Sequence, residues 1–265
     1  MAKKRHALPK IIFDAHNHLR GGEDGSETIA AQDAFGVETT VVMGLPFGSA
    51  AEIRRINKVT IASQQKYPGR LIAGVYVDPR SKKKAMDLLK HAHAEGVRLV
   101  KLFPNLGWFP DDEKFIPFFD KVDELKMGVL THCGWLWPKE MRRHAAYYSH
   151  PGRFEKVIRM HPDVPFIMAH MGGIAGLLDT VMLTTRTPNT YTDCSPGQGL
   201  WVLESTGDVA ASVPPGKLLW GADSPYHKDT FERYRKALIA RGFGPKLKAI
   251  FRDNARGIFE KLGVV

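Results

Sequence analysis

The hydrophobic positions of this 265-residue chain gather in eight short runs, and longer amphipathic stretches separate the runs. Several short runs are apolar throughout, as expected for parallel strands that are covered on both faces. We predict a strand in each run, at Ile11–Ala15, Thr39–Met43, Leu71–Val77, Val97–Phe103, Gly128–His132, Pro165–Ala169, Thr190–Cys194 and Lys217–Ala222.

The stretches between the runs predict helices, and the alternation predicts the fold. Eight strand-then-helix units of roughly 30 residues indicate an α/β fold, the (β/α)8 TIM barrel, formed as one domain over residues 1–265 with an extra C-terminal helix. The alternative, an open doubly wound sheet, usually carries a glycine-rich turn after its first strand, whereas this chain has histidines there. The helices are expected at Glu27–Phe35, Ala50–Lys66, Lys82–Ala94, Asp112–Lys126, Arg153–Met160, Gly173–Thr184, Leu200–Ala211, Lys228–Ala240 and about Gly244–Leu262.

Two histidines stand at the end of the first predicted strand. Side chains two positions apart in a strand point to the same face, so His16 and His18 should project together. Two imidazoles directed at one point indicate a metal site. His91 and His93 have the same spacing but lie in a predicted helix, where two positions differ by about 200° of rotation. That second pair is expected to be a solvated part of a helix face.

Composition narrows the class of protein but does not name a function. The chain is 43% hydrophobic and 25% charged, which is ordinary for a globular protein. No apolar run approaches the roughly 18 residues of a membrane helix, and no apolar segment follows the basic N-terminus, so a cytoplasmic protein is expected. Cys133 and Cys194 are expected to be buried free thiols. The net charge of +10 favours anionic partners, but its spread over predicted helices is typical of a solvated surface rather than a nucleic-acid footprint.

Reactive residues recur where the predicted strands end, which is where barrels of this kind carry their chemistry. Histidines together with one carboxylate suit a borderline metal such as zinc, with an open position left for water. Such an ion lowers the pKa of bound water to about 7 and polarises a carbonyl. Asp223 is the candidate general base and would also touch the metal. The strand-end residues are His16, His18, Lys101, His132, His170 and Asp223.

Each of these residues also has a structural interpretation. His132 and His170 could be satisfied core histidines, and Asp223 could cap the following turn. Lys101 could be carbamylated and bridge two metals, could bind a substrate carboxylate, or could be structural. Arg20 and His227 would form a cationic rim with Lys101, suited to a carboxylate-bearing substrate, and a surface salt bridge is the alternative for both.

Four aromatic residues follow the fourth and fifth predicted strands, on the same face as these reactive residues. They are Trp108, Phe109, Trp135 and Trp137. As the apolar wall of a pocket they would suit an aromatic or unsaturated substrate. Packing of the long loops that carry them is the alternative interpretation.

The strand-end motifs are similar to those of the amidohydrolase superfamily, in particular the amidohydrolase-related branch that includes aminocarboxymuconate semialdehyde decarboxylase. The resemblance spans nearly the whole chain. It rests on Asp14–His18, Thr131–Gly134, Ala169–Gly173, Pro188–Ser195, Trp220–Pro225 and Asp253–Arg256.

The resemblance implies a distorted barrel of the metallo-dependent hydrolase type, with a divalent metal at its mouth. In a one-metal site, His170 would polarise the substrate or move protons, and the ligands would be His16, His18, His132 and Asp223. In a two-metal site, His132 and His170 would hold a second ion and carbamylated Lys101 would bridge the two. Zinc is the expected metal, as one ion, or two if Lys101 is carbamylated.

Four functions are compatible with these residues. The first is a metal-dependent hydrolase that uses metal-activated water on a C–N or C–O bond of a small anionic substrate. The second is non-oxidative decarboxylation of an aromatic or muconate-like acid. The third is a TatD-like deoxyribonuclease, although such enzymes usually place a glutamate where this chain has Lys101. The fourth is a non-catalytic ligand-binding barrel, which predicts a missing metal residue, and none is missing. A homo-oligomer is compatible with all four.

Overall fold

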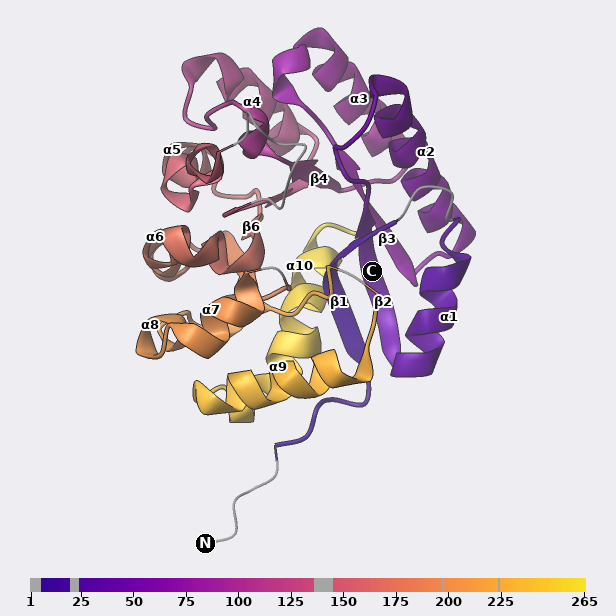
Figure 1. The fold of residues 1–265 in the computed structure, drawn as a ribbon. Helices are drawn as coiled ribbons and strands as arrows, with labels where there is room; N and C mark the ends of the chain where they lie inside the picture. Colours follow the sequence, from indigo (N-terminus) through magenta and orange to yellow (C-terminus); the bar gives the residue numbers. More distant parts are fainter. Residues whose placement is uncertain (1–5, 20–23, 136–144, 197, 224) are drawn as a thin grey trace, which may run out of the picture.

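Eight parallel strands form one sheet, in which each strand pairs with the next along the chain (Figure 1). The structure is a computed structural model and describes residues 6–19, 24–135, 145–196, 198–223 and 225–265. The predicted barrel is confirmed. Its strands are β1 (Ile12–His18), β2 (Val37–Met43), β3 (Leu71–Tyr76), β4 (Leu99–Leu102), β5 (Gly128–Thr131), β6 (Phe166–Met168), β7 (Thr190–Asp193) and β8 (Leu218–Leu219).

The sheet closes on itself just beyond the short strand β8. The Ala15 N–H donates to the Trp220 carbonyl at 3.0 Å, and the Asp223 N–H donates to the His16 carbonyl at 2.7 Å. These bonds join the chain after β8 to β1, so the first and last parts of the barrel meet. The closure places Asp223 beside the histidines of β1.

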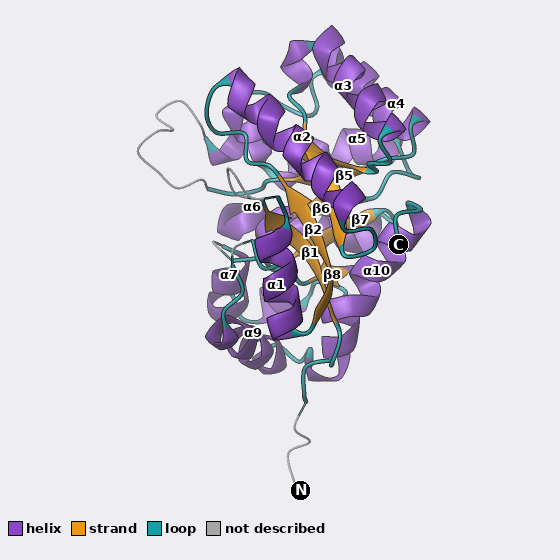
Figure 2. Ribbon diagram, turned by 90° about the vertical axis from the view of Figure 1, so that its right-hand side faces the viewer, coloured by secondary structure: helices purple, strands orange, loops and turns teal. Residues whose placement is uncertain are grey.

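The helices surround the sheet (Figure 2). Two of them, α2 and α9, have the predicted bounds. The helices are α1 (Ser26–Phe35), α2 (Ala50–Lys66), α3 (Lys83–Ala94), α4 (Ile116–Glu124), α5 (Glu155–Met160), α6 (Gly173–Arg186), α7 (Gly199–Ser205), α8 (Asp208–Ala211), α9 (Lys228–Ala240) and α10 (Asn254–Lys261).

Four predicted helices are divided in the structure. The stretch 153–160 begins within a 3₁₀ turn that ends at Phe154, and becomes α5 at Glu155. The stretch 200–211 breaks at Gly207, whose φ of 57° is left-handed, and forms α7 and α8. The stretch 112–126 begins with a 3₁₀ turn and only then becomes α4. The stretch 244–262 contains a 3₁₀ turn and a π-helical segment at Ala249–Asp253 before α10. The Ile250 carbonyl in that π segment accepts the Trp220 N–H at 2.9 Å, which ties it to the barrel seam.

The barrel interior is filled with side chains from alternating strand positions and closed at one end by α10. Phe13, Val41 and Ile72 are buried in the same cluster as Ile258 and Phe259 of α10. The rings of Phe13 and Phe259 stack with their centroids 5.5 Å apart. Because α10 covers the end where the strands begin, the carboxyl ends of the strands are left to form the site.

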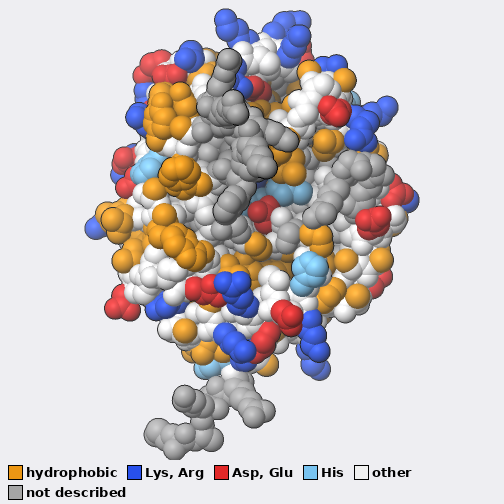
Figure 3. Space-filling view, viewed as in Figure 1, with side chains coloured by type: hydrophobic (Ala, Val, Ile, Leu, Met, Phe, Trp, Pro, Cys, Tyr) orange, Lys and Arg blue, Asp and Glu red, His pale blue; other side chains and the backbone are white. Residues whose placement is uncertain are grey.

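The expectations from composition fit this architecture. Cys133 and Cys194 are both buried and unbridged, as predicted. Within the described ranges, no helix has the length and apolar character needed to cross a bilayer. Lysine and arginine side chains are scattered around the face in Figure 3 rather than gathered in one patch, as expected for a solvated surface.

Candidate metal and catalytic site

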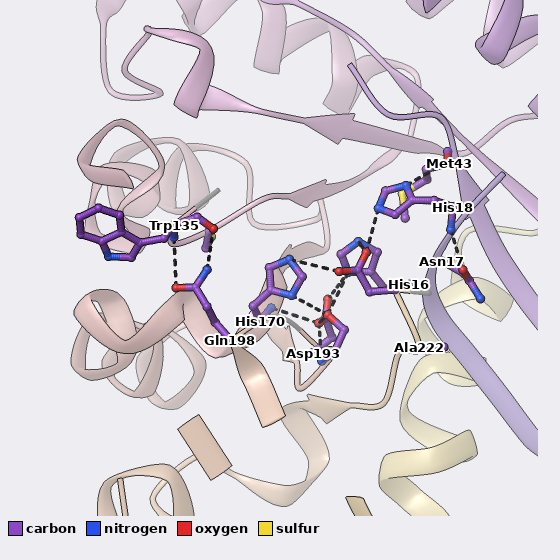
Figure 4. A network of polar contacts seen from close by, with 12 residues as sticks. His16, Asn17, His18, Met43, Trp135, His170, Asp193, Gln198 and Ala222 are labelled. Atoms are coloured by element: carbon purple, nitrogen blue, oxygen red, sulfur yellow. Dashed lines mark hydrogen bonds and ion pairs between the residues drawn. The ribbon is translucent and has the colours of Figure 1, made fainter. Parts of the chain in front are cut away.

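Polar side chains from four different strands meet at the carboxyl end of the barrel. His16 and His18 lie in β1, with their ring centroids 5.3 Å apart. His170 follows β6, and its ring lies 5.2 Å from that of His16. Asp193 ends β7 and Asp223 follows β8 (Figure 4). The structure therefore brings together most of the residues that the strand-end argument selected.

Both histidines of β1 turn a nitrogen lone pair toward Asp223. The Nδ1 atom of His18 lies 3.0 Å from the Met43 carbonyl, and Nδ1 of His16 lies 3.0 Å from the Asp193 carboxylate. Carbonyl and carboxylate oxygens only accept, so in the neutral rings the proton is on Nδ1 and Nε2 is bare. The two Nε2 atoms lie 2.9 Å (His18) and 3.5 Å (His16) from Asp223 Oδ1. A cation placed between these three acceptors would satisfy all of them.

A divalent metal fits these three ligand atoms. His16, His18 and Asp223 each offer one atom within 4.8 Å of the others. Metal–ligand bonds of about 2.0–2.2 Å place neighbouring ligands of a tetrahedral ion about 3.4 Å apart, close to the distances between the two Nε2 atoms and Asp223. His16, His170 and Asp193 form a second group of the same kind.

Lys101 lies beneath the histidines rather than on the rim of the pocket. Its side chain is fully buried, and Nζ lies 2.9 Å from His16 Nε2. Burial lowers the pKa of Lys101 to about 8, and the carboxylates of Asp223 and Asp193 limit that fall. The lysine shares the lone pair that a metal would use, so metal binding must displace this contact.

His132 stands slightly apart from the other imidazoles. Its ring stacks on Phe103 at 5.2 Å with an angle of 7°, and lies 4.9 Å edge-on to His170. Its Nε2 is buried and has no hydrogen-bond partner among the described residues. Burying a ring nitrogen without a hydrogen bond costs folding free energy unless a ligand supplies the bond. His132 belongs to neither three-residue group, so its predicted role as a metal ligand stays a prediction.

Burial and the neighbouring charges set the protonation of these groups. Burial lowers the pKa of His16 to about 4, with the Lys101 charge in the same direction. Burial also lowers the pKa of His132 well below its usual value. Burial alone would raise the pKa of Asp223, but His16, His18 and His170 outweigh it and hold that pKa below its usual value. Neutral imidazoles and an ionised carboxylate are the forms that bind metals.

Asp193 and Ser195 belong to the site, although the sequence argument did not select them. Asp193 contacts the His16 ring and accepts the His170 N–H at 3.1 Å. Ser195 Oγ lies 2.8 Å from His170 Nδ1. Asp193 ends β7 and is the residue before the end of the seventh predicted strand, so the rule that chemistry follows strand ends could have found it. Ser195 lies two residues further, and its role depends on tertiary contacts.

A buried aspartate supports the site from β1. Asp14 Oδ1 accepts the Ala222 N–H at 2.9 Å and the His16 N–H at 3.1 Å, while Oδ2 accepts the Tyr226 hydroxyl at 2.8 Å. Burial raises the pKa of Asp14 to about 7, and these donors oppose that rise. The carboxylate joins β1 to the segment that carries Asp223, so it fixes the seam at which the metal ligands meet.

A small pocket of about 150 Å³ opens beside these residues. Figure 3 shows histidine and acidic side chains at the centre of this face, with apolar side chains around them. No lysine or arginine lines the described part of the pocket. The lining consists of His18, Leu45, Phe47, Phe103, His132, Trp135, His170, Pro196, Gln198 and Asp223.

The residues predicted to bind substrate are not found together in the lining of the pocket. His227 is exposed at the start of α9 and does not line the pocket. Arg20 lies outside the described residues. With Lys101 buried beneath His16, the expected cationic rim has no member in the described pocket lining. Their predicted substrate-binding roles stay predictions.

The aromatic wall is built from different residues than expected. Trp108 is buried in the core against Phe115. Trp135 borders the pocket, but the residue is 67% exposed and its indole points away from His170 in Figure 4. Trp137 lies outside the described residues. Phe47 and Phe103 supply the apolar wall instead, packed edge to face at 5.9 Å.

A larger cavity of about 480 Å³ lies at the opposite end of the barrel. Lys126, Pro165 and Asn189, which line it, precede strands, and Leu262 follows α10. Its lining contains no histidine. Convergent ligand atoms, not cavity size, identify the functional end.

The sequence profile of the amidohydrolase family matches residues 14–261, a range that holds every site residue described above and all of the strands except the first two residues of β1. The chain belongs to this family. Membership supports an enzyme rather than a non-catalytic barrel. The curated proteins contain no match to this sequence.

Solved structures agree on the fold at low identity. 2,6-Dihydroxybenzoate decarboxylase from Rhizobium matches with a TM-score of 0.65 and 16% identity, over 96% of this chain and 99% of that one. A putative 2-pyrone-4,6-dicarboxylic acid hydrolase from Pseudomonas putida matches with a TM-score of 0.64 and 17% identity, over 96% and 99%. The D314N mutant of 5-carboxyvanillate decarboxylase from Novosphingobium aromaticivorans, with bound manganese and a nitrobenzoic acid, matches with a TM-score of 0.59 and 18% identity, over 90% and 81%.

Proposed function

We propose that this protein is a metal-dependent decarboxylase of a small, planar, aromatic or muconate-like carboxylic acid. The observation that carries the proposal is the mixed lining of the pocket, which combines His18, His170 and Asp223 with Phe47 and Phe103. A flat ring would pack against the aromatic side chains, and its carboxylate would face the metal ligands. Two of the similar structures are decarboxylases of such acids.

The absence of lysine and arginine from the described pocket lining favours a substrate with few negative charges. A dicarboxylate would need a second cation beyond the metal, and the described lining offers none. A substrate with one carboxylate needs only the charge that a metal supplies. The decarboxylases among the similar structures favour decarboxylation over the hydrolysis that the motifs alone placed first.

We assign the metal to His16, His18 and Asp223. Nitrogen and carboxylate ligands of this kind suit zinc, and also manganese, which the carboxyvanillate decarboxylase structure holds. When bound, the metal supplies positive charge that orients and stabilises an anionic substrate. Zinc remains the first ion to test.

The contribution of the protein's own residues to the reaction is to supply a proton. Decarboxylation breaks the bond between the ring and the carboxylate carbon, releases CO2, and leaves an electron pair on the ring carbon that takes up one proton. Asp223 and His170 both line the pocket, with Asp223 Oδ2 3.9 Å from His170 Nε2. Asp223 is ionised at rest, so we assign uptake of a proton from solvent to His170 and passage of that proton to the ring carbon to Asp223. Phe103 and Phe47 exclude water from the ring face.

The test is product analysis after incubation with 2,6-dihydroxybenzoate and a panel of related benzoates. Protein is purified without chelator, and its metal content is measured on the same sample. Loss of CO2 from a substrate, abolished by chelation and restored by zinc or manganese, is the expected result. A metal-loaded protein that leaves the whole panel unchanged contradicts the proposal.

Hydrolysis of a C–O or C–N bond is the second candidate. The similarity to a putative 2-pyrone-4,6-dicarboxylic acid hydrolase favours it. The same metal ligands would serve both reactions, so motifs cannot separate them. Reaction in ¹⁸O-labelled water distinguishes the two, since hydrolysis places the label in the product and decarboxylation leaves the organic product unlabelled.

A further inference from the structure

One buried carboxylate contacts two of the three histidines that face Asp223. Asp193 Oδ2 lies 3.0 Å from His16 Nδ1, and Oδ1 accepts the backbone N–H of His170 at 3.1 Å. Asp193 and His16 are fully buried, and His170 is 3% exposed. An ionised carboxylate has no proton to give, so the neutral His16 ring must carry its proton on Nδ1.

The Ser195 hydroxyl links the Asp193 carboxylate to the second ring, that of His170. Its backbone N–H donates to Asp193 Oδ1 at 3.0 Å, and its hydroxyl is in short contact with the same oxygen. The hydroxyl oxygen also lies 2.8 Å from His170 Nδ1 and 3.3 Å from His16 Nδ1. A serine has a single hydroxyl proton, so it can satisfy only one acceptor at a time.

The choice between those acceptors follows from charge. A hydrogen bond to an ionised carboxylate is roughly twice as strong as one between neutral groups. The Ser195 hydroxyl therefore donates to Asp193, and its oxygen is left to accept a proton from the rings. His170 Nδ1 must then be the donor, which leaves the Nε2 of His170 without a proton.

We propose that Ser195 is a positioning residue that carries the influence of Asp193 to His170 and fixes the tautomer in which Nδ1 bears the proton. The bare Nε2 of His170 then faces Asp223 Oδ2 at 3.9 Å and can receive a proton or a ligand. One carboxylate thus sets the tautomer of both rings, directly for His16 and through a hydroxyl for His170.

The backbone agrees with this assignment. His170 and Met171 have φ values of 58° and 54°, a left-handed conformation that is costly for residues with side chains. The bond from the His170 N–H to Asp193 helps to hold that turn and so aims the ring at Ser195. The inference depends on the proposed function only for the use made of the bare Nε2.

The test is nitrogen NMR of the full chain labelled with ¹⁵N-histidine and treated with chelator, which reports the protonated nitrogen of each ring. The His170 signals are assigned by their loss in His170→Gln. The wild type should carry the His170 proton on Nδ1, and Ser195→Ala should move it to Nε2. Ser195→Thr, which keeps the hydroxyl, should behave as the wild type.

A matched control is Ser149→Ala. Ser149 is also fully buried, and its hydroxyl donates to the Ala146 carbonyl, so this variant removes a buried hydroxyl without touching either ring. It should leave the His170 tautomer unchanged. The proposal is overturned if the wild type carries the proton on Nε2, or if Ser195→Ala retains it on Nδ1. The wild-type result decides even if Ser195→Ala does not fold.

Zinc titration separates support from direct ligation by Asp193. If Asp193 only supports His16, the His16 Nδ1 proton persists in the zinc-loaded protein, and Asp193→Asn weakens zinc binding about 10- to 100-fold. Loss of that proton on zinc addition places Asp193 among the ligands and overturns the proposal. The NMR and zinc-binding results do not depend on turnover. Failure to release CO2 would therefore contradict the proposed function without contradicting this inference.

Discussion

Two H-x-H pairs in this chain have the same spacing and opposite surroundings. His16 and His18 lie in β1, with side chains 0% and 10% exposed and rings 5.3 Å apart. His91 and His93 lie in α3, where the His91 side chain is 62% exposed and 4.0 Å from Glu95. A strand brings residues i and i+2 to one face, whereas a helix turns them away from each other.

The comparison teaches that a motif acquires its chemistry from the element that carries it. The strand pair also gains partners from distant parts of the chain: Asp193 from β7, and Asp223 from beyond β8. Among the described residues, the carboxylate that pairs with the helix histidines is Glu95, one turn from His91 at the C-terminal end of α3. The experiments below change one pair and use the other, or a matched residue, as the control.

The largest effect is expected from His16→Ala. This variant removes a lone pair that faces Asp223, so metal affinity should fall more than about 100-fold, beyond the range typical of supporting residues. Activity should fall to background. Metal content after dialysis and CO2 release measure the two effects. His91→Ala should match the wild type in both, and a loss there as large as in His16→Ala would contradict the comparison.

Asp223→Asn should reduce turnover by about 10²- to 10⁴-fold, the usual contribution of a proton-transferring group. The amide keeps the volume and the backbone bond to His16, so the melting temperature should stay close to that of the wild type. Steady-state rates and thermal unfolding measure these outcomes. Asp229→Asn, an exposed aspartate on α9, is the control. An active Asp223→Asn enzyme would remove this residue from the mechanism.

The contribution of His16 to the stability of the metal-free protein should fall as the pH falls from 7 to 4. The pKa of His16 is about 4 in the folded state and near 6.5 in the unfolded chain, so the unfolded state binds more protons in this window. The His16 contribution therefore rises with pH, by about 3 kcal/mol, while the raised pKa of Asp14 acts in the opposite direction. Urea unfolding of the wild type and of His16→Gln at several pH values measures the difference between them. That difference should change by about 3 kcal/mol between pH 7 and pH 4, whereas His91→Ala should follow the wild type at every pH.

The smallest effect concerns the support of the strand pair. Tyr226→Phe removes a hydroxyl that bonds Asp14 at 2.8 Å and Thr40 at 2.6 Å, and should cost about 1–3 kcal/mol of unfolding free energy. Tyr234→Phe is the matched control, because the Tyr234 hydroxyl is buried and has no partner among the described residues. Removing it should be neutral or stabilising. Equal losses in both variants would show that the Asp14 contacts contribute nothing specific.

Much of the fold could be predicted from hydrophobic pattern alone. Parallel strands covered on both faces are apolar throughout, so all eight could be located, and α2 and α9 could be bounded to the residue. The divided helices could not be predicted. The break at Gly207 needs a left-handed residue that periodicity does not reveal, and the π segment coincides with the bond that Ile250 makes to Trp220, a residue 30 positions away in sequence.

One rule predicted part of the site from the sequence. The residues whose roles depend on tertiary contacts could not be predicted in this way. The strand-end rule selected His16, His18, His170 and Asp223, which the structure brings together. It could not place Lys101 beneath His16, because the direction of a long side chain depends on what packs around it. It also missed Ser195, whose role depends on contacts with Asp193 and with the rings of His16 and His170 that form only in the folded barrel.

The sequence by itself determined the barrel, the family and the end of the strands at which chemistry occurs, because these depend on local pattern and on a topology with few alternatives. Tertiary structure alone decided which nitrogen of each ring faces Asp223, which cation shares the His16 lone pair, and which aromatic residues wall the pocket. Those properties are set by hydrogen-bond donors and acceptors a few ångströms apart, and the chain brings them together only when β8 closes against β1.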